Sequence, residues 1–215
     1  MILTIGHTKG GVAKSTIAIN LAVMRAAEGR DVLLVDADEQ GSSIAFTELR
    51  TDLIGHAGYT SINLHGAAVR TQVRNMATKY DDILIDAGGR DTTSLRAALV
   101  VSDMILVPVQ PRTFDIWALD PLVELVREAR EINPSLRAVA VLTIADPQGH
   151  TSEDAATALA QIPELDLLDT IICRRKVFPN AAAQGKAITE MKDPKAIAEM
   201  QALMNAVFVG APVAR

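Results

Sequence analysis

The chain has 215 residues, of which 49% are hydrophobic and 22% are charged. This composition is typical of a folded globular protein and argues against disorder, and the length favours one domain. Asp and Glu outnumber Lys and Arg by 26 to 21, so the formal net charge is −5 and the surface as a whole cannot coat nucleic acid. Aromatic residues are only 3% of the chain, which argues against a base-stacking platform for single strands.

A single cysteine, Cys173, excludes an intrachain disulfide and any zinc site built from several cysteines of one chain. Because it follows an apolar run, we expect Cys173 to be buried as a small hydrophobic residue. The first apolar run, Met1–Ile5, is too short for a secretory signal, and no apolar stretch is long enough to span a bilayer. We therefore expect a cytoplasmic protein.

Short apolar runs alternate with longer amphipathic stretches along the chain. The short runs are almost continuously apolar, as in strands that are covered on both faces, and the longer ones carry a helical stripe. Strands that alternate with helices predict a single-domain α/β fold over residues 1–215, with a mostly parallel twisted sheet and helices on both faces. In chain order the predicted elements are a strand at Ile2–Ile5, a helix at Ser15–Ala27, strands at Val32–Val35, Ile83–Ile85 and Met104–Val109, a helix at Ile116–Ile132, a strand at Val139–Thr143 and a helix at Pro194–Val209.

Two helix ends carry clear signals. Gly29 follows the first predicted helix and is a good C-terminal cap. The final helix has an apolar stripe of Ile197, Met200, Met204 and Val207, with Lys195 as its one basic residue. A membrane-targeting helix would carry several basic residues beside the stripe, so we expect this helix to dock against the core and not against a membrane.

Directly after the first strand, residues 7–16 read H-T-K-G-G-V-A-K-S-T and lead into a helix. A strand, a glycine-rich turn and a helix are the context that a phosphate-binding loop requires, because glycines let backbone amides approach the phosphate oxygens. In such a loop Lys14 would neutralise the β- and γ-phosphates, Ser15 would ligate Mg²⁺ and Thr16 would contact the α-phosphate. The strict loop pattern has glycine where this chain has Thr8 and Ala13.

Four motifs, in order, resemble the deviant Walker A ATPases of the ParA/MinD family, and within it the small plasmid-type ParA partition ATPases. Residues 9–16 resemble the K-G-G-x-G-K box, residues 35–41 the second box (D-x-D-x-Q), residues 80–86 the Walker B strand and residues 107–115 the proline-containing box. The resemblance covers about the first half of the chain and implies a P-loop NTPase fold, with ATP and Mg²⁺ as cofactors.

The resemblance also implies roles for individual residues. Lys9 resembles the signature lysine that reaches the partner's phosphates across an ATP-sandwiched dimer, and Asp38 resembles the residue that orients the attacking water. For Asp36 the sequence leaves two readings open, support of the Mg²⁺ shell or capping of the next helix, and such capping is also an alternative for Asp38. The expected catalytic residues are Lys9, Lys14 and Asp38; the expected nucleotide-binding residues are Lys9, Gly10, Gly11, Val12, Ala13, Lys14, Ser15, Thr16, Gly89 and Pro111; the expected metal-binding residues are Ser15, Asp36 and Asp86.

The sequence departs from the family pattern at two places. Where the family usually has a proline after the Walker B aspartate, this chain reads Ala87-Gly88-Gly89, which leaves the Gly89 amide available to the γ-phosphate. Ala13 occupies a position that, if it needs a positive φ, costs about 1 kcal/mol of backbone strain.

In the resembled family the ATP-bound dimer binds DNA without sequence preference, and a ParB-like or other adaptor protein stimulates hydrolysis and releases it. The resemblance thus implies slow, partner-stimulated hydrolysis and a cytoplasmic, nucleoid-associated protein that positions DNA or another cargo. No helix-turn-helix motif precedes the phosphate loop, so we expect no operator recognition. The best candidates for DNA contact are Arg174, Arg175, Lys176 and Lys186, although the cluster could equally be a solvated strand end.

The sequence also bears on three rival classes of protein. A nitrogenase-type electron-transfer ATPase needs four cysteine ligands from a dimer, and one cysteine per chain cannot supply them. A MinD-like spatial regulator at a membrane would need the basic amphipathic tail that is missing here. A catalytically weak, nucleotide-dependent scaffold remains an alternative because of Ala13 and the altered Walker B flank.

Overall fold

The computed structural model describes residues 1–89, 92–112, 116–146 and 151–210. They form a seven-stranded sheet in the order β3-β2-β4-β1-β5-β6-β7, with all its pairings parallel. This confirms the predicted single-domain α/β fold. The strands are β1 (Ile2–Gly6), β2 (Val32–Asp36), β3 (Thr60–Asn63), β4 (Asp82–Ala87), β5 (Met104–Val109), β6 (Arg137–Ala145) and β7 (Asp166–Cys173).

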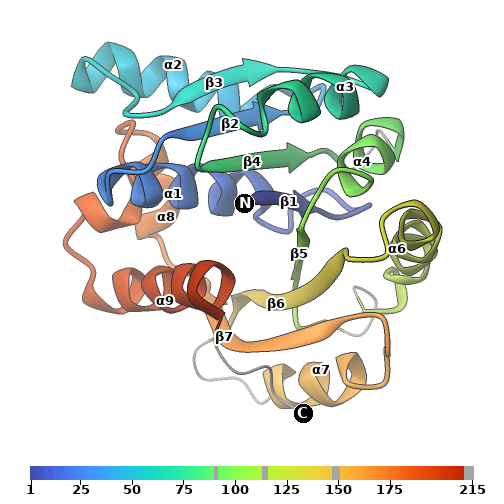
Figure 1. Cartoon of the computed structure of the whole chain (residues 1–215). Coiled ribbons are helices and arrows are strands. Elements are labelled where there is room, and N and C mark those ends of the chain that lie inside the picture. Colours follow the sequence, from blue (N-terminus) through green and yellow to red (C-terminus); the bar gives the residue numbers. More distant parts are fainter. Residues whose placement is uncertain (90–91, 113–115, 147–150, 211–215) are drawn as a thin grey trace.

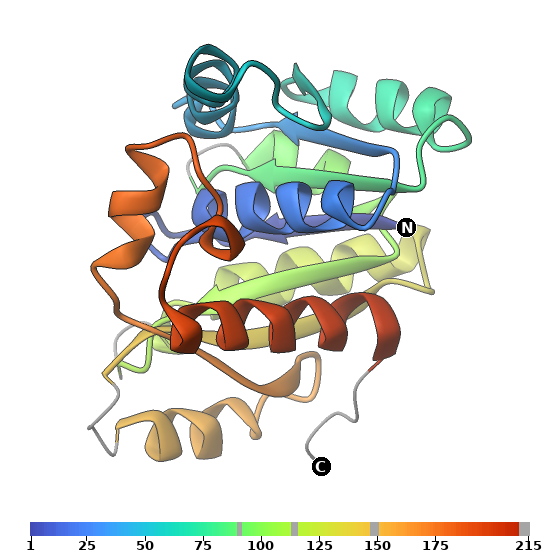
Figure 2. The ribbon, with the colours of Figure 1, turned by 90° about the vertical axis from the view of Figure 1, so that its left-hand side faces the viewer.

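Helices cover both faces of the sheet (Figures 1 and 2). One face packs on α1 (Lys14–Ala27), α8 (Val177–Ala182), the short 3₁₀ turn η1 (Ile188–Glu190), α9 (Pro194–Asn205) and the π-helical turn η2 (Ala206–Gly210). The other face packs on α3 (Ala67–Met76), α4 (Thr92–Leu99), α6 (Asp120–Ile132) and α7 (Thr151–Leu159), while α2 (Ser42–Ile54) lies beside α1 and β3.

The core consists of aliphatic side chains from alternate strand positions. On β5, for example, Leu106 faces the α1 and α9 layer, whereas Ile105 and Val107 face the α4 and α6 layer, and all three side chains are buried. Burial on both faces explains the continuous apolar runs of the central strands. The five predicted strands are all present: β5 has the predicted bounds, and the other four extend by one or two residues at one or both ends.

The predicted helix ends agree with the structure in part. Gly29 has φ 80°, and the Gly29 and Arg30 amides donate to the carbonyls of Ala26 and Arg25, which is a Schellman cap on α1. The helix predicted over Ile116–Ile132 begins later, because α6 starts at Asp120. The last residues of the proline-containing box, Thr113–Asp115, lie outside the described residues.

The C-terminal helix docks on the sheet as predicted. Met200, Met204 and Val207 are buried and Ile197 is half-buried in the core cluster shared with α1 and β7. The Phe208 ring extends this contact, since the Arg25 guanidinium of α1 lies 4.4 Å from its centroid. In the part of the chain that the structure describes, no helix has the length and apolar character needed to cross a membrane.

Cys173 is not buried in the core as expected. It ends β7, an edge strand of the sheet, and is only half-buried. The Cys173 amide donates to the Glu199 carboxylate of α9 at 3.1 Å, so this strand end meets polar groups as well as the core. Partial burial, and then the Glu199 carboxylate, raise the pKa of the Cys173 thiol.

Candidate functional site

The phosphate-loop sequence connects the carboxyl end of β1 to α1 and opens on a pocket of about 400 Å³. Six loop residues line this pocket together with Asp38 and Ile144. Asp38 lies in the segment that follows β2, and Ile144 belongs to β6. The structure thus brings the predicted phosphate-binding residues and the predicted catalytic aspartate to one cavity. The loop residues that line it are Gly10, Gly11, Ala13, Lys14, Ser15 and Thr16, while Val12 is buried beneath them.

Lys14 is 6% exposed, and its ammonium group donates to the Lys9 carbonyl at 2.8 Å. Burial lowers the pKa of Lys14, while the carboxylates of Asp86 and Asp38 act in the opposite direction. A cation held under the loop in this way has few competing water molecules, so a phosphate oxygen is a stronger partner for it than at the surface.

Ala13 caps the N-terminus of α1 in the left-handed conformation, with φ 73° and ψ 21°. Ala13 therefore meets the condition, a positive φ, under which the sequence analysis assigns it backbone strain. Left-handed backbone costs an L-residue with a Cβ roughly 1–2 kcal/mol, a cost that glycine avoids. The loop also contains Gly11 at φ 76°, where glycine adopts the same region freely.

Two side chains that the sequence analysis did not single out hold the loop from outside. Gln110, at the end of β5, donates to the Gly11 carbonyl at 2.9 Å, and the buried Thr143 hydroxyl of β6 donates to the Val12 carbonyl at 3.1 Å. Gln110 lies within the proline-containing box, which was a usable signal. Thr143 carried none, because a threonine in an apolar strand is unremarkable.

Asp36 caps the next helix, which was one of the two readings that the sequence left open. One carboxylate oxygen accepts from the Ser43 and Ile44 amides at 2.9 Å each, and the other accepts from the Asp38 amide at 3.1 Å. Burial raises the pKa of Asp36 in spite of these three amide donors. The Ser43 hydroxyl continues the network and donates to Asp86 at 2.7 Å.

Asp86 ends this network at the carboxyl end of β4 and is fully buried. Its Oδ2 accepts from Ser43, its carboxyl also accepts from Ser15, and its Oδ1 is buried without a hydrogen-bond partner. Burial raises the pKa of Asp86 to about 6, although Ser15, Ser43 and Lys14 favour the ionised form. An unsatisfied buried carboxylate oxygen is costly unless a cation or an ordered water completes it.

The Ser15 hydroxyl and the Asp86 carboxylate are oxygen ligands that fit a magnesium ion. Mg²⁺ prefers hard oxygen ligands and keeps several water molecules, so one carboxylate and one hydroxyl are a sufficient protein contribution. The described residues contain no group of three or more His, Cys, Asp or Glu side chains that could hold a metal, which disfavours an all-protein cage there. Ser15 and Asp86 contact each other, and their binding of Mg²⁺ stays a prediction, while both oxygens of Asp36 already accept hydrogen bonds from amides.

The two glycines after β4 pack against the other predicted catalytic residues. A Cβ at Gly88 would come within 2.5 Å of the Asp38 carboxyl carbon, and a Cβ at Gly89 within 2.7 Å of the Lys9 carbonyl carbon. A side chain at either glycine would therefore press on Asp38 or on the phosphate-loop backbone, whereas Ala87, which stands where the family usually has proline, is a buried residue of β4. Asp38 itself accepts from the Gln40 amide at 3.0 Å.

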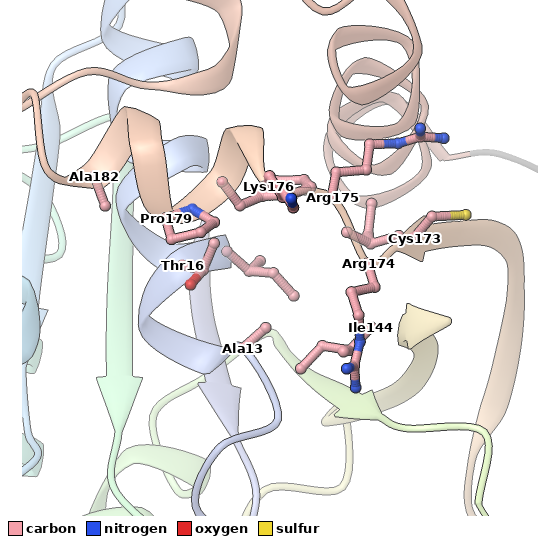
Figure 3. Close-up of a pocket in the computed structure, with 12 residues that line it drawn as sticks. Ala13, Thr16, Ile144, Cys173, Arg174, Arg175, Lys176, Pro179 and Ala182 are labelled. Atoms are coloured by element: carbon pink, nitrogen blue, oxygen red, sulfur yellow. The ribbon is translucent and has the colours of Figure 1, made fainter. Parts of the chain in front are cut away.

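A second pocket of about 430 Å³ adjoins the first, because Ala13, Thr16 and Ile144 line both. Figure 3 shows the side chains of Ala13 and Ile144 at one end of it and Lys176 and Pro179 at the other. Most of its lining is apolar. Its other lining residues are Ile17, Ile172, Cys173, Arg174, Arg175, Phe178 and Ala182.

The predicted DNA residues are thus divided by the structure. Arg174, Arg175 and Lys176 line this second pocket, and Arg175 forms an ion pair with Glu199 at 2.5 Å. Lys186 does not line it, and its ammonium group lies 3.5 Å from the Gln184 side-chain oxygen. A role of these residues in DNA contact stays a prediction.

Pro111 is the one predicted nucleotide-binding residue that the structure places on a different pocket. It is buried and lines a cavity of about 490 Å³ with Arg112, Ile116, Trp117 and residues of α7. Its neighbour Gln110 contacts the phosphate loop instead. A contact of Pro111 with nucleotide stays a prediction.

Comparisons with known proteins agree with this geometry. The chain is 26% identical, over 96% of its length and 95% of the relative's, to the maintenance of carboxysome distribution protein A of Halothiobacillus neapolitanus. It is 28% identical, over 87% of both chains, to the chromosome-partitioning ATPase Soj of Thermus thermophilus. The structure of cobyrinic acid a,c-diamide synthase from Mycobacterium smegmatis with an ATP analogue and magnesium has the same fold, with a TM-score of 0.79 at 21% identity over 99% of this chain and 97% of that one.

The match to a family is also direct. Residues 3–188, which include the whole phosphate loop and the seven strands except Ile2 of β1, match the CobQ/CobB/MinD/ParA nucleotide binding domain. The chain therefore belongs to the CobQ/CobB/MinD/ParA nucleotide-binding family.

Proposed function

We propose that this chain is an ATPase that partitions DNA or positions another cargo, switching between states as it binds and hydrolyses ATP. The observation that carries the proposal is the pocket in which the phosphate loop, the buried Lys14 and Asp38 meet. Phosphoryl transfer needs positioning and charge neutralisation more than covalent help, and these residues supply both. The relatives above 25% identity that carry functional names act in carboxysome distribution and chromosome partitioning, which supports this reading.

The triphosphate binds over the loop amides, and Lys14 exchanges its carbonyl partner for phosphate oxygens. Ser15 and Asp86 would hold Mg²⁺, whose charge would neutralise that of the phosphates. The unpartnered Oδ1 of Asp86 supports this role, because ligation gives that buried oxygen the partner it lacks. Asp36 contributes indirectly, by fixing Ser43, which in turn orients Asp86.

The nucleotide base occupies the neighbouring pocket of about 430 Å³. Ile144, Ile172, Phe178 and Pro179 give it apolar walls that suit a planar ring, and Thr16 lies where the two pockets meet. Arg174 and Lys176 line the same pocket, so their positive charge also attracts the anionic nucleotide.

The switch depends on a second copy of the chain. Lys9 and the exposed Gly10 and Gly11 lie on the open side of the loop, where a facing subunit would cover them. ATP then favours a dimer in which Lys9 reaches the partner's phosphates, and hydrolysis releases it. The ATP-bound dimer binds DNA without sequence preference, and an adaptor protein stimulates turnover that is otherwise slow.

The test is ATP turnover measured with Mg²⁺, with and without double-stranded DNA and the candidate adaptor. We expect slow basal turnover that the partners stimulate. Asp38→Ala should keep ATP-dependent dimerisation and lose hydrolysis, because it removes the group that orients water and leaves the loop intact. Wild-type turnover in that variant would remove the role assigned to Asp38.

A nucleotide-dependent scaffold is the second candidate, and the strained Ala13 is the observation that favours it. A strained loop weakens the grip on the phosphates and could leave binding without useful hydrolysis. The same assay separates the two functions, since intact ATP binding with no stimulated turnover would support the scaffold.

A further inference from the structure

Side chains from three different parts of the chain donate hydrogen bonds to carbonyls of the phosphate loop. Lys14 of α1 donates to the Lys9 carbonyl, Gln110 after β5 to the Gly11 carbonyl, and Thr143 of β6 to the Val12 carbonyl. In a trans peptide the carbonyl and the following amide point in opposite directions. A carbonyl that is held outward therefore turns the next amide toward the pocket, where a phosphate needs a donor.

The Thr143 contact comes from an irregular part of the sheet. Thr143 pairs with Ile172 and Ala145 pairs with Cys173, so Ile144 is an extra residue that forms a bulge in β6. Ile144 has φ 53°, which is a strained conformation for a β-branched residue. Bulges next to active sites redirect side chains, and this one accompanies a threonine that reaches the loop and an isoleucine that lines both pockets.

The bulge and the loop each contain one strained residue next to the Thr143–Val12 hydrogen bond. Ala13 and Ile144 are the two non-glycine residues with positive φ within residues 1–89, 92–112, 116–146 and 151–210. Each directly follows a partner of the same hydrogen bond, because Ala13 follows Val12 and Ile144 follows Thr143. Figure 3 shows their side chains at the same end of the second pocket.

We propose that Thr143 is a positioning residue for the phosphate loop. Its hydroxyl holds the Val12 carbonyl away from the pocket, keeps Ala13 in the left-handed conformation and so aims the Ala13 amide at the triphosphate. Glycine would adopt this conformation unaided, whereas alanine needs the hydrogen bond as a restraint. Thr143 is 0% exposed, so water cannot easily replace the hydroxyl. The assignment rests on the proposed nucleotide-binding function.

The test compares variants of the full chain by calorimetric titration with Mg²⁺ and a non-hydrolysable ATP analogue. Thr143→Val keeps the shape and removes the hydrogen bond, and we expect binding about two- to tenfold weaker. Thr143→Ser restores the hydroxyl and should restore affinity. Thr4→Val is the matched control, because Thr4 is an equally buried strand threonine whose hydroxyl bonds Ser102 at 2.7 Å instead of the loop.

Ala13→Gly provides the decisive second measurement. If Thr143 restrains Ala13, the Thr143→Val substitution should cost clearly less affinity in the Ala13→Gly background than in the wild-type background. Should the valine variant not fold, Thr143→Ala allows the same comparison. Unfolding by urea without nucleotide reports the stability of each variant, and we expect Thr143→Val and Thr4→Val to lose similar stability but only the first to lose affinity.

Three results would overturn the assignment: wild-type affinity in Thr143→Val, equal losses of affinity in Thr143→Val and Thr4→Val, or an unchanged cost of Thr143→Val in the Ala13→Gly background. A wild-type chain that binds no nucleotide would instead overturn the proposed function, and with it any positioning role for Thr143.

Discussion

Ala13 is strained by its left-handed conformation at the N-terminus of α1. Ala13→Gly should therefore raise the free energy of unfolding by about 0.5–1 kcal/mol, because relief of strain exceeds the larger entropy of glycine in the unfolded chain. Urea unfolding followed by circular dichroism measures the change. Ala26→Gly, in the last turn of the same helix, is the control and should lower stability, since glycine loses more conformational entropy than alanine on folding. A loss of stability in both variants would show that position 13 is not strained.

A substitution at Gly88 should affect ATP turnover more than folding stability. An alanine here would place its Cβ 2.5 Å from the Asp38 carboxyl carbon, so the flexible Asp38 side chain must move. We expect Gly88→Ala to change folding stability little and to lower ATP turnover by on the order of 10–100-fold, because a displaced group no longer orients the water. Steady-state turnover and nucleotide affinity should be measured together with Asp38→Ala. Unchanged turnover would mean that Asp38 need not stay where Gly88 leaves room for it.

Residues near one another in the sequence were the predictable part of the site. The loop, Lys14 and Ser15 follow from one short segment, and Asp38 and Asp86 follow from strand ends that a parallel sheet brings to the same edge. Thr143 meets a carbonyl 131 residues away, and Gln110 meets one 99 residues away. Such contacts depend on strand order and on the bulge in β6, neither of which a single sequence reveals.

At the scale of elements, burial decided which strands the sequence revealed. The five predicted strands have covered faces and read as apolar runs. β3, Thr60–Asn63, is a four-residue edge strand of half-buried and exposed residues, and β7, the other edge, mixes exposed, half-buried and buried residues without a regular period. An edge strand loses the continuous apolar signal, which is why β3 was not predicted and β7 was noticed only as an apolar run before a possible strand end.

The ion pair between Arg50 of α2 and Glu190 of η1 predicts a pH dependence of the free energy of unfolding. The nearly buried Arg50 forms two hydrogen bonds with the Glu190 carboxylate, at 2.7 and 2.9 Å. Burial alone would raise the pKa of Glu190, but the hydrogen bonds from Arg50 and the Ala187 amide, with the Arg50 charge, hold it below the ordinary 4.5. The ionised form is thus the one that the fold stabilises, and its contribution is present above pH 4.5 and is lost as the pH falls through the lowered value.

Glu190→Gln tests the contribution of this ion pair to stability. At neutral pH it should lower the free energy of unfolding by about 1.5–3 kcal/mol, because Arg50 loses its charged partner. The difference from the wild type should shrink as the pH falls below the ordinary carboxyl range, where Glu190 is protonated as well. Urea unfolding at a series of pH values gives both curves. A difference that stays constant into acid would show that the charge of Glu190 does not stabilise this contact.

At the scale of the whole molecule, the sheet brings the phosphate loop, Asp38 and Asp86 together at the carboxyl ends of its strands. Gly10 and Gly11 are exposed there. The net charge of −5 means that any DNA contact must use a local basic surface, not the molecule as a whole. A nucleotide-dependent dimer would join two such exposed phosphate-loop surfaces and couple ATP hydrolysis to partner binding.

The most direct measurement is sedimentation of the chain with and without Mg²⁺ and a non-hydrolysable ATP analogue, combined with titration of the same ligand. We predict that the wild type binds the nucleotide and becomes a dimer, that Lys14→Ala binds none, and that Lys9→Ala binds it yet stays monomeric. Nucleotide affinity retained by Lys14→Ala, or a Lys9→Ala variant that dimerises like the wild type, would contradict the shared grip of both lysines on one triphosphate.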